Sequence, residues 1–196
     1  MKTRADAWSL LNDYTQSASL LKHALAVEAS MVWYAKNLSQ SNPEITPTEV
    51  ERFAICGLLH DFDYEKFPEP VSPEGHPYKG NAILKELGFD DDIREAIMGH
   101  ALYTGVPRTT LMAKTLFAVD ELSGLVTASV YVRPDKSIHN LEAKSVMKKM
   151  KDKAFARGCN RDDIRLGAQE LGVELEQHIT NVIEAMKVAS KEIFDN

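Results

Sequence analysis

Histidine and aspartate residues recur in this chain within segments that have the apolar spacing of buried helices. They are His23, the pair His60-Asp61, His76, His100 and Asp120. Ionisable side chains are rarely found in such segments without a partner, because burying a charge or an unsatisfied polar group costs free energy. Imidazole and carboxylate groups that converge on one interior are the donors that a transition-metal ion requires. The sequence therefore predicts metal-assisted chemistry, although it does not identify the substrate.

Asp120 lies in the segment LMAKTLFAVDELSGLVTA. At helical spacing it shares a face with Ala113, Leu116, Phe117, Gly124 and Thr127. An unpaired carboxylate on that face would be costly, and a bound metal would remove the cost. A buried aspartate that pairs with a lysine or caps a neighbouring helix is the alternative. Glu121 is rotated by about 100° from Asp120, so we expect it to face solvent.

The histidines differ in what surrounds them. His23 and His100 border apolar helical faces, where a histidine can also be a core residue satisfied by hydrogen bonds. Adjacent residues do not share a helical face, so His60 and Asp61 can meet one metal only where a helix ends between them. His76 precedes a proline, which places it either at the start of a helix facing a site or in an exposed loop. His139 and His178 have polar neighbours, and we expect both at the surface.

The helical period dominates the chain, and it predicts an all-α fold. The first expected helix covers about residues 17–39, and the second begins at the N-cap Thr46, with Pro47 at its first position and Glu49 completing a capping box. The next runs from Pro77 to the stop at Gly88, and another is opened by Asp90, Asp91 and Asp92. A long helix is expected at about residues 109–132. The lysine-rich residues 140–157 are expected to be helical, a short helix should start at Asn160 or Arg161, and Gly172 precedes a last helix through Phe194. The proline- and glycine-rich segment DFDYEKFPEPVSPEG is expected to be a loop after His60. The stretch VTASVYV is β-branched, but we assign it to the helix that it continues.

The composition is that of a soluble globular domain. The chain has 196 residues, of which 44% are hydrophobic and 27% charged, and its net charge of −6 disfavours binding to nucleic-acid polymers. No apolar run approaches the length of a membrane span, and the N-terminus lacks the apolar stretch of a signal peptide. Cys56 and Cys159 are not expected to form a disulfide. We therefore expect a cytoplasmic protein, and the sequence leaves its oligomeric state open.

The order His23, His60-Asp61 and Asp120, with each group on a separate helix, resembles the HD superfamily of metal-dependent phosphohydrolases. His76, with Gly80 four residues later, and His100 resemble the subset of that superfamily that binds two metals. The stretches LLHDFDYEKFP, GHPYKGNAILKELG, LFAVDELSGLV and VRPDKSI are similar to a group of bacterial HD hydrolases of this length. The HDIG subgroup has Ile-Gly after His-Asp, whereas Phe62-Asp63 follows here, so no particular substrate is carried over from that subgroup.

This resemblance implies a single HD domain over residues 1–196: a helical bundle with its metal-binding core at about 17–132 and additional C-terminal helices at about 139–196. It also implies which residues bind metal. A first divalent ion would be held by His23, His60, Asp61 and Asp120, and Asp61 would bridge to a second ion that is also held by His76 and His100. Ligands of these types suit Fe, Mn, Zn, Co or Ni without choosing among them. Two such ions can activate a shared water for attack on phosphorus.

A small phosphorylated substrate would need positive charge beside the metals. The candidates are Lys66, five residues after the catalytic Asp61, Arg108 and Lys114 before Asp120, and Arg133 and Lys136 after the same helix. Residues 131–161 contain nine Lys or Arg and only three Asp or Glu, an asymmetry that could attract anions to one face. A solvated lysine-rich helix is the alternative for residues 144–153. Asp63 could orient a water or Lys66, or be a plain loop acid.

Three functions are compatible with these residues. The first is hydrolysis of a small phosphate ester or nucleotide by a metal-bound hydroxide, with Asp61 and Lys66 as catalytic residues. The second is oxygen activation, because some HD proteins use a similar ligand set as di-iron oxygenases. The third is a non-catalytic metal-binding or signalling module. The basic residues favour hydrolysis, and the complete ligand set argues against a module without catalysis.

Overall fold

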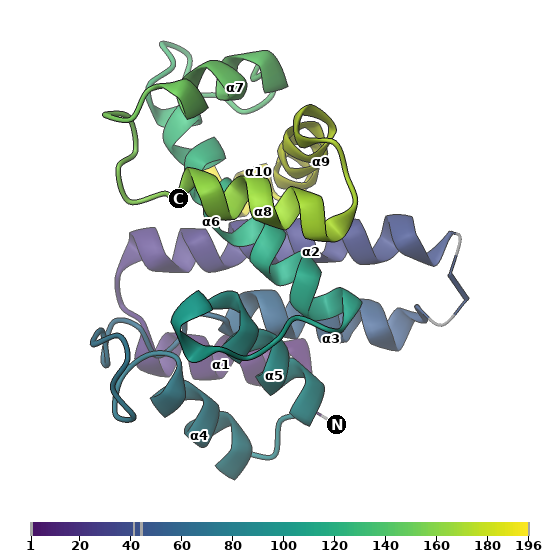
Figure 1. The fold of residues 1–196 in the computed structure, drawn as a ribbon, viewed down its shortest axis with the longest axis vertical. Helices are drawn as coiled ribbons and strands as arrows, with labels where there is room; N and C mark the ends of the chain where they lie inside the picture. The colour runs from purple at the N-terminus through teal and green to yellow at the C-terminus, as the bar shows by residue number, and fades with distance from the viewer. Residues whose placement is uncertain (1, 41, 44, 196) are drawn as a thin grey trace.

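In the computed structural model, the described residues 2–40, 42–43 and 45–195 form an all-helical bundle (Figure 1). The helices in chain order are α1 (Arg4–Tyr14), α2 (Ala18–Ser39), α3 (Pro47–Leu59), α4 (Tyr78–Glu86), α5 (Asp91–His100), the 3₁₀ helix η1 (Leu102–Thr104), α6 (Leu111–Tyr131), α7 (Ala143–Lys151), α8 (Arg161–Leu171), α9 (Leu175–Val188) and α10 (Ser190–Phe194). No strand occurs among these residues, so the predicted all-α class is confirmed.

Helices α2 and α3 lie side by side through the middle of the molecule and form its most extensive helix pair (Figure 1). Their close approach requires a glycine, since a Cβ atom on Gly57 would lie 2.8 Å from the Cα atom of Glu28. Real Cβ atoms do not come so close to backbone, so a larger residue would push the helices apart. The small residue therefore brings the end of α3 next to the first half of α2, where His23 lies.

Helix α6 connects the two halves of the molecule. It packs against α2 and α5 on one side and against α8 and α9 on the other (Figure 1). Most of its surface is covered, and Leu116, Leu122, Leu125 and Val126 are fully buried. The stretch VTASVYV is the C-terminal part of this helix, as predicted from its continuous period. Asp120 lies near the middle of α6, which packs against α2 and α5.

Several helix ends follow the signals in the sequence. Thr46 caps α3 with its side chain, although Glu49 supplies only its backbone N–H and the predicted capping box is incomplete. Asp90 precedes α5, and Asp91 and Asp92 occupy its first turn. Asn160 caps α8 by accepting hydrogen bonds from two backbone N–H groups. Side-chain caps therefore account for the predicted starts of α3 and α8.

Other expectations were wrong. Helix α1, which begins with a Thr3–Asp6 capping box, was not anticipated. The lysine-rich helix is shorter than predicted and ends at Lys151, and the last helical segment is divided into α9 and α10 at Ala189. His178, which we expected at the surface, is fully buried. It faces the interior because the turns of α9 that carry it pack on α2 and α6.

Both cysteines are free, as predicted, with Cys56 buried and Cys159 partly exposed. In the part of the chain that the structure describes, no helix combines the length and the apolar character needed to cross a bilayer.

Candidate metal centre

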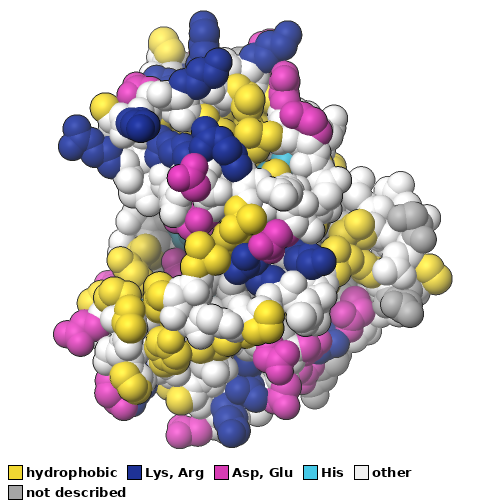
Figure 2. Space-filling view, viewed as in Figure 1, with side chains coloured by type: hydrophobic (Ala, Val, Ile, Leu, Met, Phe, Trp, Pro, Cys, Tyr) yellow, Lys and Arg dark blue, Asp and Glu magenta, His cyan; other side chains and the backbone are white. Residues whose placement is uncertain are grey.

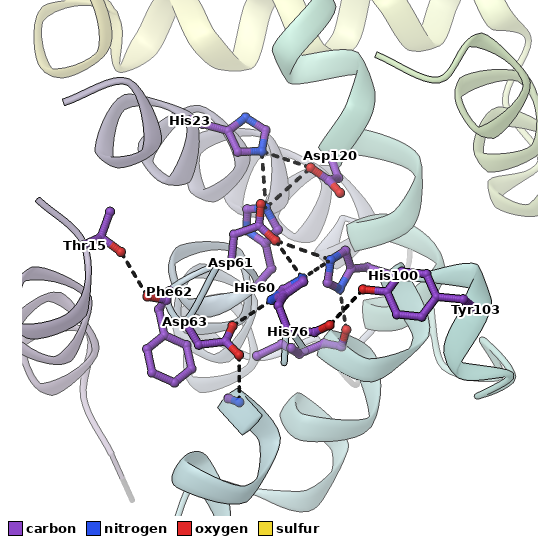
Figure 3. A network of polar contacts seen from close by, with 12 residues as sticks. Thr15, His23, His60, Asp61, Phe62, Asp63, His76, His100, Tyr103 and Asp120 are labelled. Carbon is purple, nitrogen blue, oxygen red and sulfur yellow. Dashed lines mark hydrogen bonds and ion pairs between the residues drawn. The ribbon is translucent and has the colours of Figure 1, made fainter. Parts of the chain in front are cut away.

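Six predicted ligand residues from five parts of the chain meet at one place (Figure 3). His23 comes from α2, His60 caps α3, Asp61 begins the turn that follows, His76 precedes α4, His100 ends α5 and Asp120 comes from α6. His60 and Asp61 face the same point because the helix ends at Leu59, as the sequence required. The bundle therefore brings together residues up to 97 positions apart.

The first group contains His23, His60, Asp61 and Asp120. Asp120 Oδ1 lies 3.0 Å from His23 Nε2 and 3.4 Å from His60 Nε2. The two Nε2 atoms are 3.3 Å apart, and Asp61 Oδ2 is 3.5 Å from that of His60. Donor atoms of His23, His60 and Asp61 all lie within 4.8 Å of one another. This group has the size and composition of a transition-metal site.

The second group uses the other oxygen of Asp61. Oδ1 lies 3.2 Å from His76 Nε2 and 3.4 Å from His100 Nε2, and these nitrogens are 3.3 Å apart. Donor atoms of these three residues also lie within 4.8 Å of one another. Asp61 therefore presents one oxygen to each group, which is the geometry of a carboxylate bridging two ions.

Hydrogen bonds at Nδ1 hold three of the imidazole rings in place. Nδ1 of His60 donates to the carbonyl of Gly57 over 2.8 Å, and Nδ1 of His100 donates to the carbonyl of Ile97. Nδ1 of His76 donates over 2.7 Å to Asp63, whose other oxygen accepts the Gly80 backbone N–H at 2.7 Å (Figure 3). Such partners fix the tautomer and leave each Nε2 atom with a lone pair directed at the centre.

These lone pairs need a cation between them. The Nε2 atoms of His76 and His100 face both each other and Asp61 Oδ1, so three electron-rich atoms meet without a donor hydrogen if the rings are neutral. Protons on both rings would instead place two positive charges at adjacent nitrogens. One metal ion satisfies all three atoms at once. The residues therefore fit a divalent metal, and the same reasoning applies to His60 in the first group.

The pKa shifts of His60 and Asp120 also support a cation at the centre. Burial by itself would lower the pKa of His60, but the carboxylates of Asp61 and Asp120 hold it well above 6.5. Burial by itself would raise the pKa of Asp120, but His60 and His23 lower it well below its ordinary value. Both shifts arise because ionised carboxylates lie next to His60 and stabilise positive charge there. A place where carboxylates stabilise positive charge suits a bound cation.

A cavity of about 580 Å³ opens over the two groups. Its floor contains His23, Asp61, His76, His100 and Asp120. Its walls are formed by Tyr64, Ala101, Leu102, Tyr103, Phe117, Glu121, Gly124, Gly158, Cys159, Asn160 and Asp163. Figure 2 shows an indented surface between the part of the molecule that contains α7 and α8 and the part that contains α4 and α5. The cavity is large enough for a small molecule whose reactive group reaches the floor.

The comparison with known families agrees with this geometry. The family model described as "HD domain" matches residues 20–125, which include all six residues of the centre. The chain belongs to the HD domain family. Proteins of this family generally bind divalent metals and are mostly metal-dependent phosphohydrolases. Helices α7 to α10 lie outside the matched part of the HD domain. No curated protein and no solved structure matched the chain.

The predicted cationic residues do not line the cavity of this HD domain. Lys66 Nζ donates over 2.7 Å to the carbonyl of Asp13 and lies over the ring of Tyr14. Arg108 forms a bidentate ion pair with Glu170. The predicted role of Lys66 in holding phosphate is therefore not supported, because its ammonium group is directed at the end of α1.

Arg133 and Lys136 also lie outside the cavity lining. Arg133 forms a bidentate ion pair with Asp135, two residues away, and Lys136 occupies the adjoining turn with a φ of 45°. Lys114, near the start of α6, is absent from the lining as well. The segment after Pro134 does not bend back over Asp120 as a substrate role for Arg133 would require.

Some residues of the site gave no clear signal in the sequence. Glu121, expected in solvent, is half-buried in the cavity wall, and burial together with the charge of Asp120 raises its pKa to about 7. Asp63 is buried and holds His76, a role that its position in a loop did not specify. Tyr103 donates to the His76 carbonyl from η1. In the sequence, only its position three residues after His100 indicates that Tyr103 lies near the site.

Proposed function

We propose that this HD domain is a metal-dependent phosphohydrolase that acts on a small phosphate ester, with two divalent ions as cofactors. The observation that supports it most is the division of the Asp61 carboxylate between two sets of imidazole nitrogens. A single metal would not require both oxygens to face separate donor groups. Two neighbouring ions are a recurring arrangement in enzymes that displace groups at phosphorus.

In this proposal, His23, His60, Asp61 and Asp120 hold one ion, and Asp61, His76 and His100 hold the other. When bound, the ions would lower the pKa of a water and neutralise charge on the phosphate oxygens. The protein supplies the orientation. Gly57, Ile97 and Asp63 fix the rings through their Nδ1 atoms, so little reorganisation is needed when the substrate arrives.

The cavity favours a small phosphorylated substrate over a polymer. Its volume of about 580 Å³ is in the range of small-molecule sites. Aromatic side chains of Tyr64, Tyr103 and Phe117 can hold the organic part, with the phosphate at the floor. None of the described lining residues is Lys or Arg, so the proposed ions would provide the positive charge that the phosphate needs.

A screen of phosphate esters with and without added Mn²⁺ tests the proposal. Cleavage of at least one small ester should depend on metal and should fall by at least 10³-fold in Asp61→Asn, which removes the shared charge. Asp13→Asn, an exposed aspartate near the end of α1, is the matched control and should retain full activity. If the metal-loaded protein cleaves no ester, the proposed hydrolysis is refuted.

A further inference from the structure

His76 lies directly before α4 rather than inside a regular helix, so its position depends on individual hydrogen bonds. Asp63 holds its ring, and its backbone N–H donates over 2.8 Å to the carbonyl of Phe67. Its backbone carbonyl accepts a hydrogen bond of 2.9 Å from the hydroxyl of Tyr103 (Figure 3). Every polar group of His76 other than the Nε2 atom that faces the centre is therefore held by a separate partner.

The beginning of α4 explains why the His76 carbonyl needs a donor from elsewhere. The neighbouring carbonyls of Gly75 and Pro77 each accept, over 2.9 Å, from the backbone N–H four residues later. The same pattern would pair the His76 carbonyl with the Gly80 N–H, but that N–H donates to Asp63 over 2.7 Å. Because His76 is buried, a carbonyl without a donor would be costly. The hydrogen bond that Asp63 takes from the helix is thus replaced from another segment.

Tyr103, which supplies the replacement, belongs to the segment that also carries His100. Helix α5 ends at His100, and η1 begins two residues later. The hydroxyl of Thr104 donates over 2.8 Å to the carbonyl of Met98, which fixes η1 to the end of α5. The Tyr103 hydroxyl therefore joins the segment of His100 to the segment of His76.

We infer that Tyr103 is a positioning residue for the second ion: its hydroxyl fixes the backbone of His76 relative to His100 and thereby sets the affinity of that ion. The inference rests on the two-ion arrangement of the proposed function. The two Nε2 atoms are 3.3 Å apart, and metal–ligand distances vary by only about 0.2 Å, so a small drift of one backbone segment would weaken the site. Tyr103 acts through His76, because the His76 carbonyl engages its hydroxyl.

Tyr64 provides a matched comparison. Both tyrosines line the cavity, and each is 43% exposed. The ring of Tyr64 packs edge-on against that of His76, with centroids 5.5 Å apart, and its hydroxyl has no hydrogen-bond partner among the described residues. Removing the Tyr64 hydroxyl therefore changes the same cavity wall without releasing the backbone of His76.

Calorimetric titration of Mn²⁺ into the metal-free protein tests the inference. Wild type and Tyr64→Phe should bind two ions with the same pair of affinities. In Tyr103→Phe one ion should bind as in wild type, which also shows that the variant folds, and the other about tenfold more weakly, at the lower end of what the loss of a group orienting a metal ligand costs. In His100→Ala, which keeps only the first ion, adding Tyr103→Phe should change the affinity by less than about twofold.

Equal affinities for both ions in Tyr103→Phe and wild type would overturn the inference. Equal weakening of both ions would also overturn it, because that result indicates a general structural role. Both results leave the proposed hydrolysis intact. A wild type that binds one ion at saturating Mn²⁺ would overturn this inference together with the two-ion part of the proposed function. Failure to cleave any ester would count against the proposed function alone, because the titration does not depend on turnover.

Discussion

His178 should make the stability of this protein depend on pH in a way that can be separated from the metal centre. Its Nε2 donates over 2.8 Å to the carbonyl of Ala118, and its Nδ1 accepts a hydrogen bond of 2.6 Å from the Tyr34 hydroxyl. The ring is fully buried, with both nitrogens satisfied in the neutral form. A second proton on Nδ1 would compete with the hydrogen bond from the Tyr34 hydroxyl and place a positive charge in the interior, so protonation should oppose folding.

The size of the effect follows from the pKa. Burial lowers the pKa of His178 from 6.5 to about 4. Between these values the unfolded chain binds more protons than the folded one, so the free energy of unfolding rises with pH. The stabilisation is complete above the unfolded pKa and is lost as the pH falls toward the folded pKa. With about 1.4 kcal/mol per pKa unit, we expect His178 to account for a loss of about 2 kcal/mol between pH 7 and pH 5.

Urea unfolding of wild type and His178→Gln at pH 5, 6 and 7 measures this contribution. Glutamine retains one donor and one acceptor but does not titrate, and the metal-centre histidines titrate alike in both proteins, so they cancel in the difference. Wild type should lose its advantage over the variant as the pH falls. His139→Gln, which changes an exposed histidine, should show no such trend. A difference between wild type and His178→Gln that stays constant within about 0.5 kcal/mol would refute the reasoning.

Three further perturbations test other parts of the structure. Asp63→Asn cannot accept from both His76 and Gly80, so the affinity for one of two bound ions should fall by about 10- to 100-fold in a metal titration; unchanged affinity for both would contradict the positioning role. Gly80→Ala would place a Cβ 2.5 Å from the Asp63 carboxyl carbon and should cost about 1–3 kcal/mol in denaturant unfolding, whereas Gly158→Ala meets no atom within 4 Å and should cost little; equal losses would argue against the clash. Lys66→Ala should leave kcat and KM for any cleaved ester unchanged, and a lower kcat would restore the catalytic role predicted from its spacing.

Local signals explain what could be predicted from the sequence. The apolar period, the caps at Thr46 and Asn160 and the acidic first turn at Asp91 and Asp92 depend on neighbours within a few residues, so the helices could be placed. The meeting of His60 and Asp61 at a helix end was also a local inference. The grouping of six distant residues came from a family resemblance, and the match of the family model to residues 20–125 supports that resemblance.

The remaining features depend on contacts between distant segments. Helix α1 was not anticipated, and the carbonyl of Asp13 at its end takes the ammonium group of Lys66. Asp163 reaches the cavity only because α8 packs on α6. His178 follows Gln177 and reads as polar from its neighbours, although its side of α9 also carries the buried Val182 and Ala185. Spacing along one helix cannot show which face another helix will cover.

The most direct test of the central claim is anomalous diffraction from crystals of the Mn²⁺-loaded protein. The account predicts two peaks, one contacted by His23, His60, Asp61 and Asp120 and the other by Asp61, His76 and His100, with metal–nitrogen distances of about 2.1–2.3 Å. In His100→Ala crystals the second peak should be lost while the first remains. Absence of both peaks at saturating metal, or peaks that these residues do not contact, would contradict the account.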